Sequence, residues 1–228
     1  MTEAAPARTD PEDDLDAYAA QAAHQLGEAV ALLQGYLVVL EQRGQRDPDI
    51  ADALSGLSAG TQRAQRFVDD LLDLSATGRA APARERVELD DVLAQARGRL
   101  RDELRDAVTE VRAGALPVVR ADRELVIRLF VHLLRVALAS GARAVEVSGV
   151  ADGDATVQVD VRDDGAPTAG DPFAPFARAR GRGPLVGAGV GLTVCRRIVE
   201  LHGGAIGLLG EDDGATRVTF TLPADPMP

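Results

Sequence analysis

Residues 187–204 read GAGVGLTVCRRIVELHGG, and this stretch decides the fold of the second half of the chain. Three alternating glycines, Gly187, Gly189 and Gly191, precede an apolar-periodic segment that two further glycines end. The pattern predicts a helix over about residues 189–202. Glycines in this place let the backbone approach phosphate groups, which the unpaired N–H groups and the dipole of a helix N-terminus favour. A tight turn into a helix is the plainer interpretation of the same glycines.

The sequence on both sides of this stretch alternates between strand and helix patterns. Short strands are predicted at 86–88, 108–111 and 117–120, and helices at 89–104 and, after the capping residue Asp122, up to about residue 140. Two hairpins follow, at 144–162 and 205–222, which turn at Asp152-Gly153 and Asp213-Gly214. A loop at 163–186 lies between them, and loops of this length in compact domains are usually functional.

The N-terminal part has a different pattern, with two helical stripes of apolar residues. The first comprises Leu15, Ala19, Ala22, Leu26, Ala29, Leu33, Leu37 and Leu40, and the second comprises Ile50, Leu54, Leu57, Thr61, Ala64, Val68 and Leu71. Asp47-Pro48 suits the start of the second helix. A lone helical hairpin leaves both stripes partly uncovered, so we expect a second copy and a homodimeric four-helix bundle.

The helix that carries the first stripe contains one histidine, His24, which lies on the side opposite the predicted core positions Ala22 and Leu26. The segments AAHQLGEAV (22–30) and FVDDLLDLS (67–75) resemble the H-box region of bacterial histidine kinases, in particular the phytochrome-like branch. The resemblance implies that His24 is the phosphoacceptor. Gln25 stands where the family has an acid, and Glu28, one turn further on, is the possible orienting base. An incidental surface histidine and ordinary helix surface charge are the alternatives.

The second part resembles the ATPase domain shared by histidine kinases, gyrase, Hsp90 and MutL, through residues 187–204 and the Asp163-Asp164-Gly165 motif. The resemblance implies an α+β fold, an α/β sandwich of the histidine kinase/gyrase/Hsp90 ATPase (Bergerat) type. It also implies that Asp163 receives the adenine amino group. The implied nucleotide-binding residues are Asp163, Gly165, Gly187, Gly189, Gly191 and Leu192.

Segment 132–139, HLLRVALA, departs from the family pattern, in which an Asn at the fifth position holds Mg²⁺. Val136 occupies that position, and its hydrocarbon side chain has no lone pair for a hard cation. Phosphoryl transfer from ATP depends on that metal. We therefore expect no metal site, weak or absent ATP binding and no ordinary Mg-ATP catalysis.

The predicted organisation is a disordered acidic arm (1–14), a dimerisation and phosphoacceptor hairpin (15–78), a linker (79–85), an ATPase-like domain (86–223) and a tail (224–228). A net charge of −11 argues against a nucleic-acid partner. The single cysteine, Cys195, and the lack of a long apolar segment predict a cytoplasmic protein without a membrane partner.

Three functions fit these patterns. The favoured one is a two-component phosphotransferase that exchanges a phosphoryl group between His24 and a response-regulator receiver domain. The alternatives are an atypical but active ATP-dependent sensor histidine kinase, and a non-catalytic pseudokinase that pairs with a partner histidine kinase. Labelling with radioactive ATP separates the second function from the other two.

Overall fold

The computed structural model divides into two compact units, Met1–Arg79 and Ala80–Pro228. It describes residues 26–28, 30–31, 33–38, 40, 48–78, 81–153, 155–165, 173, 177–178, 188–210 and 214–225. The first unit contains helical residues between 26 and 40 and the long helix α2 (Pro48–Gly78). The predicted second helix and its start at a proline are confirmed.

Packing within the first unit joins the helical residues 26–40 to α2. Val30, Leu37 and Val68 are buried. A Cβ atom on Gly27 would lie 3.4 Å from Cγ1 of Val68, so the backbone of Gly27 packs against the side chain of Val68.

Within the single chain, only part of the predicted apolar stripe of the first helix is buried. Leu26, Leu33 and Leu40 are 51%, 54% and 51% exposed, whereas Leu37 is buried together with Val30, which the predicted stripe did not include. The exposed leucines recur every seven residues, as do the two buried residues. The helix therefore has two apolar lines, and α2 of the same chain covers only one of them.

The second unit is built on a five-stranded sheet with the order β2-β4-β5-β9-β8. These strands are β2 (Glu110–Ala113), β4 (Ala144–Asp152), β5 (Thr156–Asp163), β8 (Ile206–Gly210) and β9 (Thr216–Pro223). β2 and β4 are parallel and the other pairs are antiparallel. The two smaller sheets pair β1 (Glu85–Glu88) with β3 (Val118–Ala121), and β6 (Ala177–Arg178) with β7 (Ala188–Gly189).

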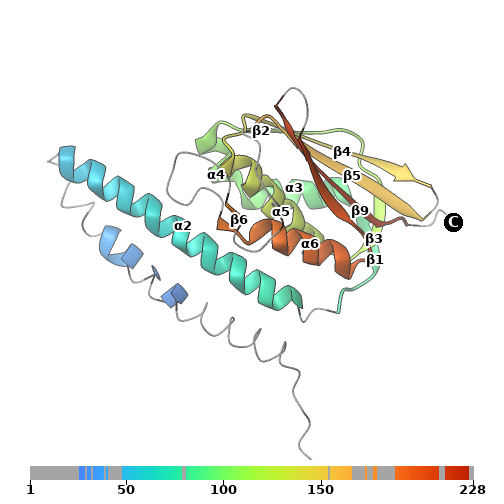
Figure 1. The fold of residues 1–228 in the computed structure, drawn as a ribbon, viewed down its shortest axis with the longest axis horizontal. Helices are drawn as coiled ribbons and strands as arrows, with labels where there is room; N and C mark the ends of the chain where they lie inside the picture. The colour runs from blue at the N-terminus through green and yellow to red at the C-terminus, as the bar shows by residue number, and fades with distance from the viewer. Residues whose placement is uncertain are drawn as a thin grey trace, which may run out of the picture. The chain divides into compact units, whose positions relative to one another are not determined.

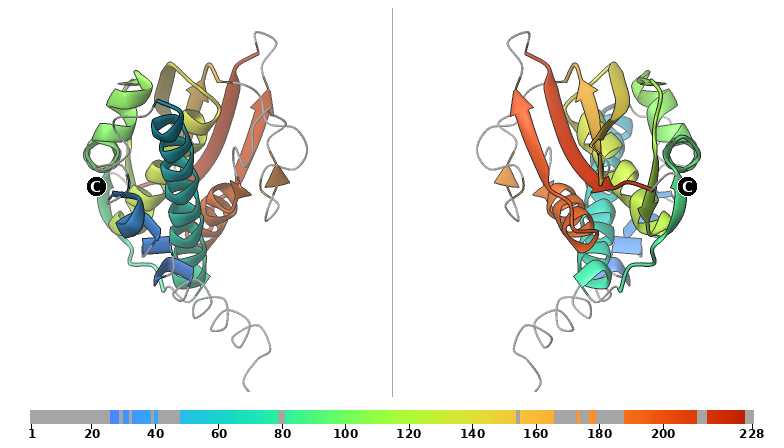
Figure 2. Two further views of the ribbon diagram at one scale, coloured as in Figure 1. Left: turned by 90° about the vertical axis from the view of Figure 1, so that its left-hand side faces the viewer. Right: turned by 90° about the vertical axis from the view of Figure 1, so that its right-hand side faces the viewer.

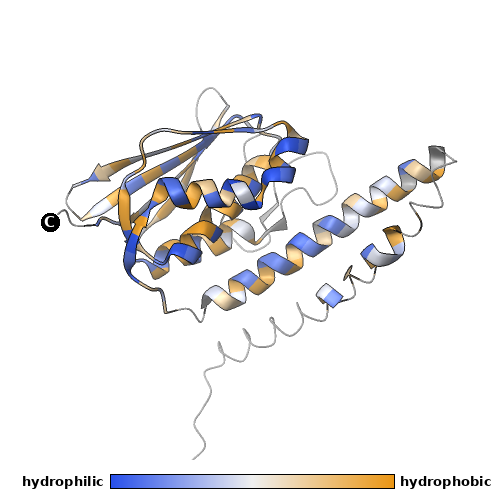
Figure 3. Ribbon diagram, turned by 180° about the vertical axis from the view of Figure 1, so that it is seen from behind, coloured by the Kyte–Doolittle hydropathy of each residue, from blue (hydrophilic) through white to orange (hydrophobic). Residues whose placement is uncertain are grey.

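The helices of the second unit cover one face of this sheet (Figure 1 and Figure 2). They are α3 (Leu89–Arg99), α4 (Arg101–Ala107), α5 (Arg123–Ala139) and α6 (Gly191–Leu201). Strands β5 and β9 alternate between buried and half-buried side chains, and Figure 3 shows the corresponding alternation of hydropathy. Phe130 of α5 and Phe220 of β9 pack edge to face with their centroids 6.0 Å apart. The mixed α/β architecture is thus the predicted one.

Helix α5 begins as the sequence predicts. Oδ1 of Asp122 accepts the N–H of Leu125 at 3.1 Å, and Oδ2 accepts the N–H of Ala83 at 3.0 Å. The backbone N–H of Asp122 in turn donates to Nε2 of His202 at 2.9 Å. One residue therefore caps α5 and ties it to the preceding linker segment and to the end of α6.

Two predicted boundaries are wrong. The predicted helix 89–104 is two helices, α3 and α4, because the chain turns at the buried residue Leu100, two residues after Gly98. The predicted strand 108–111 begins at Glu110, because Val108 ends α4 in a left-handed conformation. At Leu100 burial overrides the helix propensity, and at Val108 the cap of α4 overrides the strand propensity.

Val108 has φ = 55° and ψ = 42°, which a β-branched residue rarely adopts, and it is 70% exposed. Replacement by glycine removes this strain and loses little packing. We expect Val108→Gly to raise the free energy of unfolding by about 1 kcal/mol. Urea denaturation followed by circular dichroism tests this, with the exposed strand residue Val150 changed to glycine as a control that should be destabilised.

The last described residues, assigned to a tail by the sequence, are attached to the small β1–β3 sheet. Asp225 lies 3.3 Å from Nε of Arg86 and 2.7 Å from Nε of Arg120, and Ala224 bridges to Val119. This contact closes the second unit at its C-terminal end. Among the helices in the described parts of the chain, none is both long and apolar enough to span a bilayer.

Candidate functional site

Asp163 ends β5 with its side chain on the helix-covered face of the sheet, and it is only 6% exposed. Its Oδ1 accepts the N–H of Gly165 at 2.9 Å. Burial raises the pKa of this carboxyl group, and the hydrogen bond from Gly165 only partly opposes that effect. A buried carboxyl group whose pKa is shifted in this way is a candidate functional residue.

Three further residues lie next to Asp163: one at the C-terminal end of α5, one in the segment after β5 and one on the neighbouring strand β9. Ser140, at the end of α5, has its Oγ 3.2 Å from Oδ1 of Asp163. Gly165 fits only as glycine, because a Cβ atom there would collide with the side chain of Ser140. Thr216 of β9 is the strand partner of Asp163. We call these four residues, Ser140, Asp163, Gly165 and Thr216, the Asp163 cluster.

Thr216 was not found from the sequence. Its side chain is 4% exposed, and its hydroxyl oxygen has no hydrogen-bond partner in the described part of the structure. A buried hydroxyl without a partner costs about 1–3 kcal/mol, so a bound group that satisfies it would gain affinity. The two-residue alternation of β9 does not fix its register against β5, so no local signal in the sequence places Thr216 opposite Asp163.

Asp164, next to Asp163, has a structural role. Its Oδ1 accepts the backbone N–H groups of Ala144 at 2.9 Å and of Arg143 at 2.7 Å. These hydrogen bonds lower the pKa of the exposed Asp164 carboxyl group. Of the two adjacent acids, Asp163 is therefore the buried one.

Val136 and His132 lie on α5, whose C-terminal capping residue is Ser140. Val136 is half-buried, and its carbonyl oxygen accepts the N–H of Ser140 at 3.0 Å, so it is one helical turn from the Asp163 cluster. His132 is buried, 2% exposed, among the core residues of the helix. Within the described residues, no group of three or more His, Cys, Asp or Glu side chains is placed to hold a metal ion. The residues present at this position do not fit Mg²⁺.

We call the three alternating glycines of segment 187–191 the glycine box. This segment leads into α6 through the short strand β7. Gly189 lies in β7, opposite Ala177 of β6, and Gly191 is the first residue of α6. The helix therefore starts two residues later than predicted. Leu192 is 4% exposed and belongs to the apolar core face of α6, so its side chain contributes packing. Gly187 lies outside the described residues.

Helix α6 also holds a residue of the predicted loop at 163–186. Phe173 is buried, its carbonyl oxygen accepts the hydroxyl of Thr193 at 3.1 Å, and the guanidinium of Arg196 lies 4.7 Å from its ring centroid. Phe173 is thus anchored to the first two turns of α6, next to the glycine box at the N-terminus of the same helix.

His24 and Gln25 lie outside the described residues, and Glu28 is exposed on its helix. The other two histidines of the chain, His132 and His202, are both 2% exposed. His202 accepts an N–H at Nε2 from Asp122, and its Nδ1 donates to the carbonyl oxygen of Ile198 at 2.7 Å. These two bonds fix His202 as the neutral Nδ1–H tautomer, with a structural role.

Residues 121–226 match the family described as histidine kinase-, DNA gyrase B-, and HSP90-like ATPase. The chain is 30% identical over 223 residues to cyanobacterial phytochrome A of Nostoc sp. (strain PCC 7120). The aligned region covers 92% of this chain and 28% of the phytochrome. It is 28% identical over 215 residues to the sensor protein FixL of Bradyrhizobium diazoefficiens, which covers 89% of this chain and 42% of FixL. The chain therefore spans less than half the length of these relatives.

Solved structures with the same fold include full-length ShkA in complex with AMPPNP, with a TM-score of 0.67 and 21% identity over 92% of this chain and 46% of that one. Histidine kinase AdeS of Acinetobacter baumannii has a TM-score of 0.57 and 19% identity over 89% of this chain and 98% of AdeS. The chain is thus a homologue of sensor histidine kinases and carries a histidine kinase-, DNA gyrase B- and HSP90-like ATPase domain.

Proposed function

We propose that this protein carries a phosphoryl group on His24 and exchanges it with an aspartate of a response-regulator receiver domain. An imidazole nitrogen of His24 attacks the phosphorus of the aspartyl phosphate, a P–N bond forms, and the P–O bond to the aspartate carboxylate breaks. The reverse step returns the group. The protein is then a phosphotransferase of the histidine-kinase type in which ATP is not the main donor.

The burial of the other two histidines is the observation that carries this proposal. A phosphoacceptor must be reached by a second protein, and His132 and His202 are each 2% exposed. His202 also has both ring nitrogens engaged in hydrogen bonds. His24 remains as the candidate for phosphorylation on histidine.

The described part of the first helix supports an accessible His24. If the helix continues at 3.6 residues per turn, Glu28, Ala31, Gly35 and Val38 lie within about 40° of His24 around its axis. All four are exposed. Glu28 follows His24 by one turn, where its carboxylate would orient the imidazole.

The ATPase-type domain supports a reduced role for ATP. The Asp163 cluster is formed, and we infer that it still accepts the base of an adenine nucleotide. Val136, one helical turn from Ser140, offers no ligand to a cation that would bridge the phosphates. Binding without that bridge is expected to be weak and to support little transfer.

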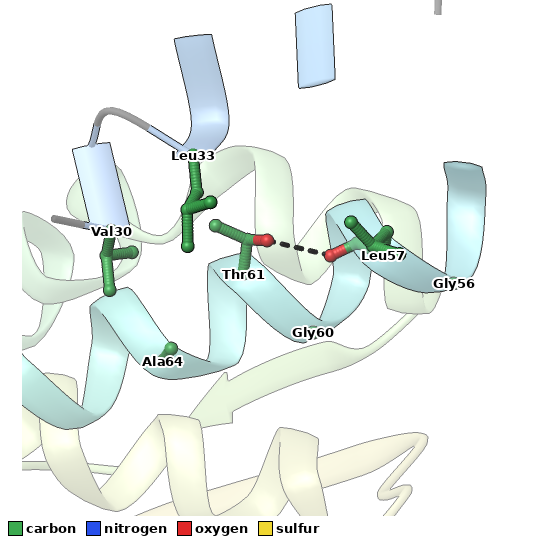
Figure 4. A pocket seen from close by; sticks show the side chains of 7 residues that line it. All are labelled: Val30, Leu33, Gly56, Leu57, Gly60, Thr61 and Ala64. Atoms are coloured by element: carbon green, nitrogen blue, oxygen red, sulfur yellow. Dashed lines mark hydrogen bonds between the residues drawn. The ribbon is translucent and has the colours of Figure 1, made fainter. Parts of the chain in front are cut away.

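An open apolar groove in the first unit supports assembly as a homodimer. It has a volume of about 540 Å³ and is lined by Val30, Leu33, Gly56, Leu57, Gly60, Thr61 and Ala64 (Figure 4). The Thr61 hydroxyl donates to the carbonyl oxygen of Leu57 at 2.8 Å, so the hydroxyl hydrogen of this residue is already bonded within α2. Small residues four apart on α2 leave room for larger side chains, and Leu33 and Leu57 are more than half exposed. A second copy would cover this face.

We expect Leu33→Glu to convert the dimer to a monomer, because a charge in the apolar interface costs several kcal/mol when it is desolvated. Size-exclusion chromatography with light scattering measures the change in mass. Leu209→Glu is the matched control, since Leu209 is also exposed but lies on β8 of the second unit. A monomeric wild type, or a dimer that survives the change at Leu33, would rule out this interface.

An active ATP-dependent kinase is the second candidate, and the intact Asp163 cluster favours it. Two labelling reactions separate the candidates: the pure protein with Mg²⁺ and ATP radiolabelled on the γ-phosphate, and the protein with receiver domains radiolabelled by acetyl phosphate. The proposed phosphotransferase takes label from a receiver and little or none from ATP. Strong labelling from ATP would establish the kinase, and no labelling in either reaction would establish a non-catalytic protein.

A further inference from the structure

Ser140, the C-terminal capping residue of α5, is the member of the Asp163 cluster that comes from this end of the helix. Its Oγ lies 3.2 Å from Oδ1 of Asp163 and 2.8 Å from the carbonyl oxygen of Ala137. It also fills the space beside Gly165, where a Cβ atom would lie within 2.7 Å of the Cβ of Ser140. The hydroxyl is thus fixed between the last turn of the helix and the end of β5.

The hydroxyl of Ser140 has a single hydrogen, and its two acceptors are the carbonyl oxygen of Ala137 and Oδ1 of Asp163. The protonation state of Asp163 therefore decides which acceptor receives this hydrogen. When Asp163 is charged, the hydroxyl donates to Oδ1. When Asp163 is protonated, the carboxylic acid can donate to Oγ and the hydroxyl can donate to Ala137. In both arrangements the contact engages Oδ1, which also accepts the N–H of Gly165.

The second carboxylate oxygen is left for a ligand. Within the described residues, Oδ2 of Asp163 receives no hydrogen bond. The buried Thr216 hydroxyl, also without a partner among these residues, comes from the neighbouring strand position. An oxygen acceptor beside a hydroxyl that can donate or accept suits the amino group and ring nitrogen of an adenine edge.

We propose that Ser140 is a positioning residue for base recognition: it holds Oδ1 of Asp163 so that Oδ2 faces the exocyclic amino group of an adenine nucleotide. This inference rests on the proposed role of Asp163 in nucleotide binding. Ser140 acts through Asp163 and does not itself contact the base. Its removal should therefore reduce discrimination between bases more than it reduces overall nucleotide affinity.

Isothermal titration of the full chain with ATP and with inosine triphosphate tests this, because hypoxanthine has an oxygen in place of the adenine amino group. We expect the wild type to prefer ATP. Ser140→Ala should weaken ATP binding by about tenfold and leave the inosine nucleotide unchanged. Ser140→Thr, which keeps the hydroxyl, should restore the preference. Ser148→Ala, on the exposed side of β4, is the matched control and should behave as the wild type.

Each other outcome overturns the inference. Unchanged ATP binding in Ser140→Ala means that the hydroxyl does not position Asp163, and an equal loss for both nucleotides means that Ser140 serves the fold alone. A wild type that binds neither nucleotide also overturns it, yet leaves phosphotransfer through His24 standing. Base discrimination in a protein whose His24 accepts no phosphate would overturn only the proposed function.

Discussion

His24→Ala is expected to accept no phosphoryl group from any phosphorylated receiver domain. The imidazole nitrogen is the nucleophile in the proposed transfer, and alanine has no group that forms a P–N bond. The two remaining histidines are buried and do not substitute for it. The loss should be complete, in contrast to the partial loss that follows when a supporting residue is changed.

This variant should keep its fold and the proposed dimer, because alanine is the best helix former and the predicted position of His24 faces away from both apolar lines of the helix. Gln34→Ala, a polar residue of the same helix, is the control and should accept phosphate at the wild-type rate. Radiolabel transfer on a gel measures acceptance, and light scattering checks the dimer. Retained acceptance by His24→Ala would mean that another residue is the acceptor.

Asp163→Asn is expected to abolish adenine nucleotide binding and to stabilise the protein. The amide group presents N–H donors or a poorer acceptor to the adenine amino group, so recognition is lost. The carbonyl oxygen of the asparagine can still accept the N–H of Gly165, while the buried charge disappears. We expect a gain of about 1 kcal/mol in unfolding free energy, or about 2–4 °C in melting temperature.

The pH dependence of this gain has a definite sign. Because burial raises the pKa of Asp163 in the folded protein, the charged form destabilises the fold only as pH rises through that pKa. The advantage of Asp163→Asn should be small near about pH 4 and full near about pH 8. Urea denaturation at both pH values measures it.

Asp164→Asn is the matched control with the opposite sign. Hydrogen bonds from Ala144 and Arg143 lower the pKa of Asp164, so its charge stabilises the fold above the ordinary aspartate range and this contribution is lost in acid. This variant should lose stability near neutral pH and keep nucleotide binding. Normal ATP binding by Asp163→Asn would remove Asp163 from the site, and a destabilised variant would contradict the cost assigned to its buried charge.

Much of the second unit was predictable from local patterns. The Asp122 cap, the turns at Gly153 and Gly214 and the two-residue alternation of β5 and β9 are short-range signals, and each is found where it was expected. The boundaries at Leu100 and Val108 were missed because they depend on burial and on a helix cap. Asp163 was identified from its motif, and its burial distinguishes it from Asp164.

The rest of the Asp163 cluster depends on contacts between distant segments. Ser140 and Thr216 are unremarkable in the sequence, and they become site residues only when α5 ends beside β5 and β9 pairs with it. Periodicity has a related limit in the first helix, because it shows which residues are apolar and not which partner covers them. Leu26, Leu33 and Leu40 are exposed in the single chain.

Mass spectrometry of the phosphorylated protein tests the role of His24 most directly. The basic residues that flank the first helix are Arg8 and Arg43, so trypsin releases residues 9–43 as one peptide in which His24 is the only histidine. After incubation with a phosphorylated receiver domain, this peptide should carry one phosphate that is lost in acid, as expected for a P–N bond. An unmodified peptide, an acid-stable phosphate or a phosphate on another peptide would contradict the proposed function.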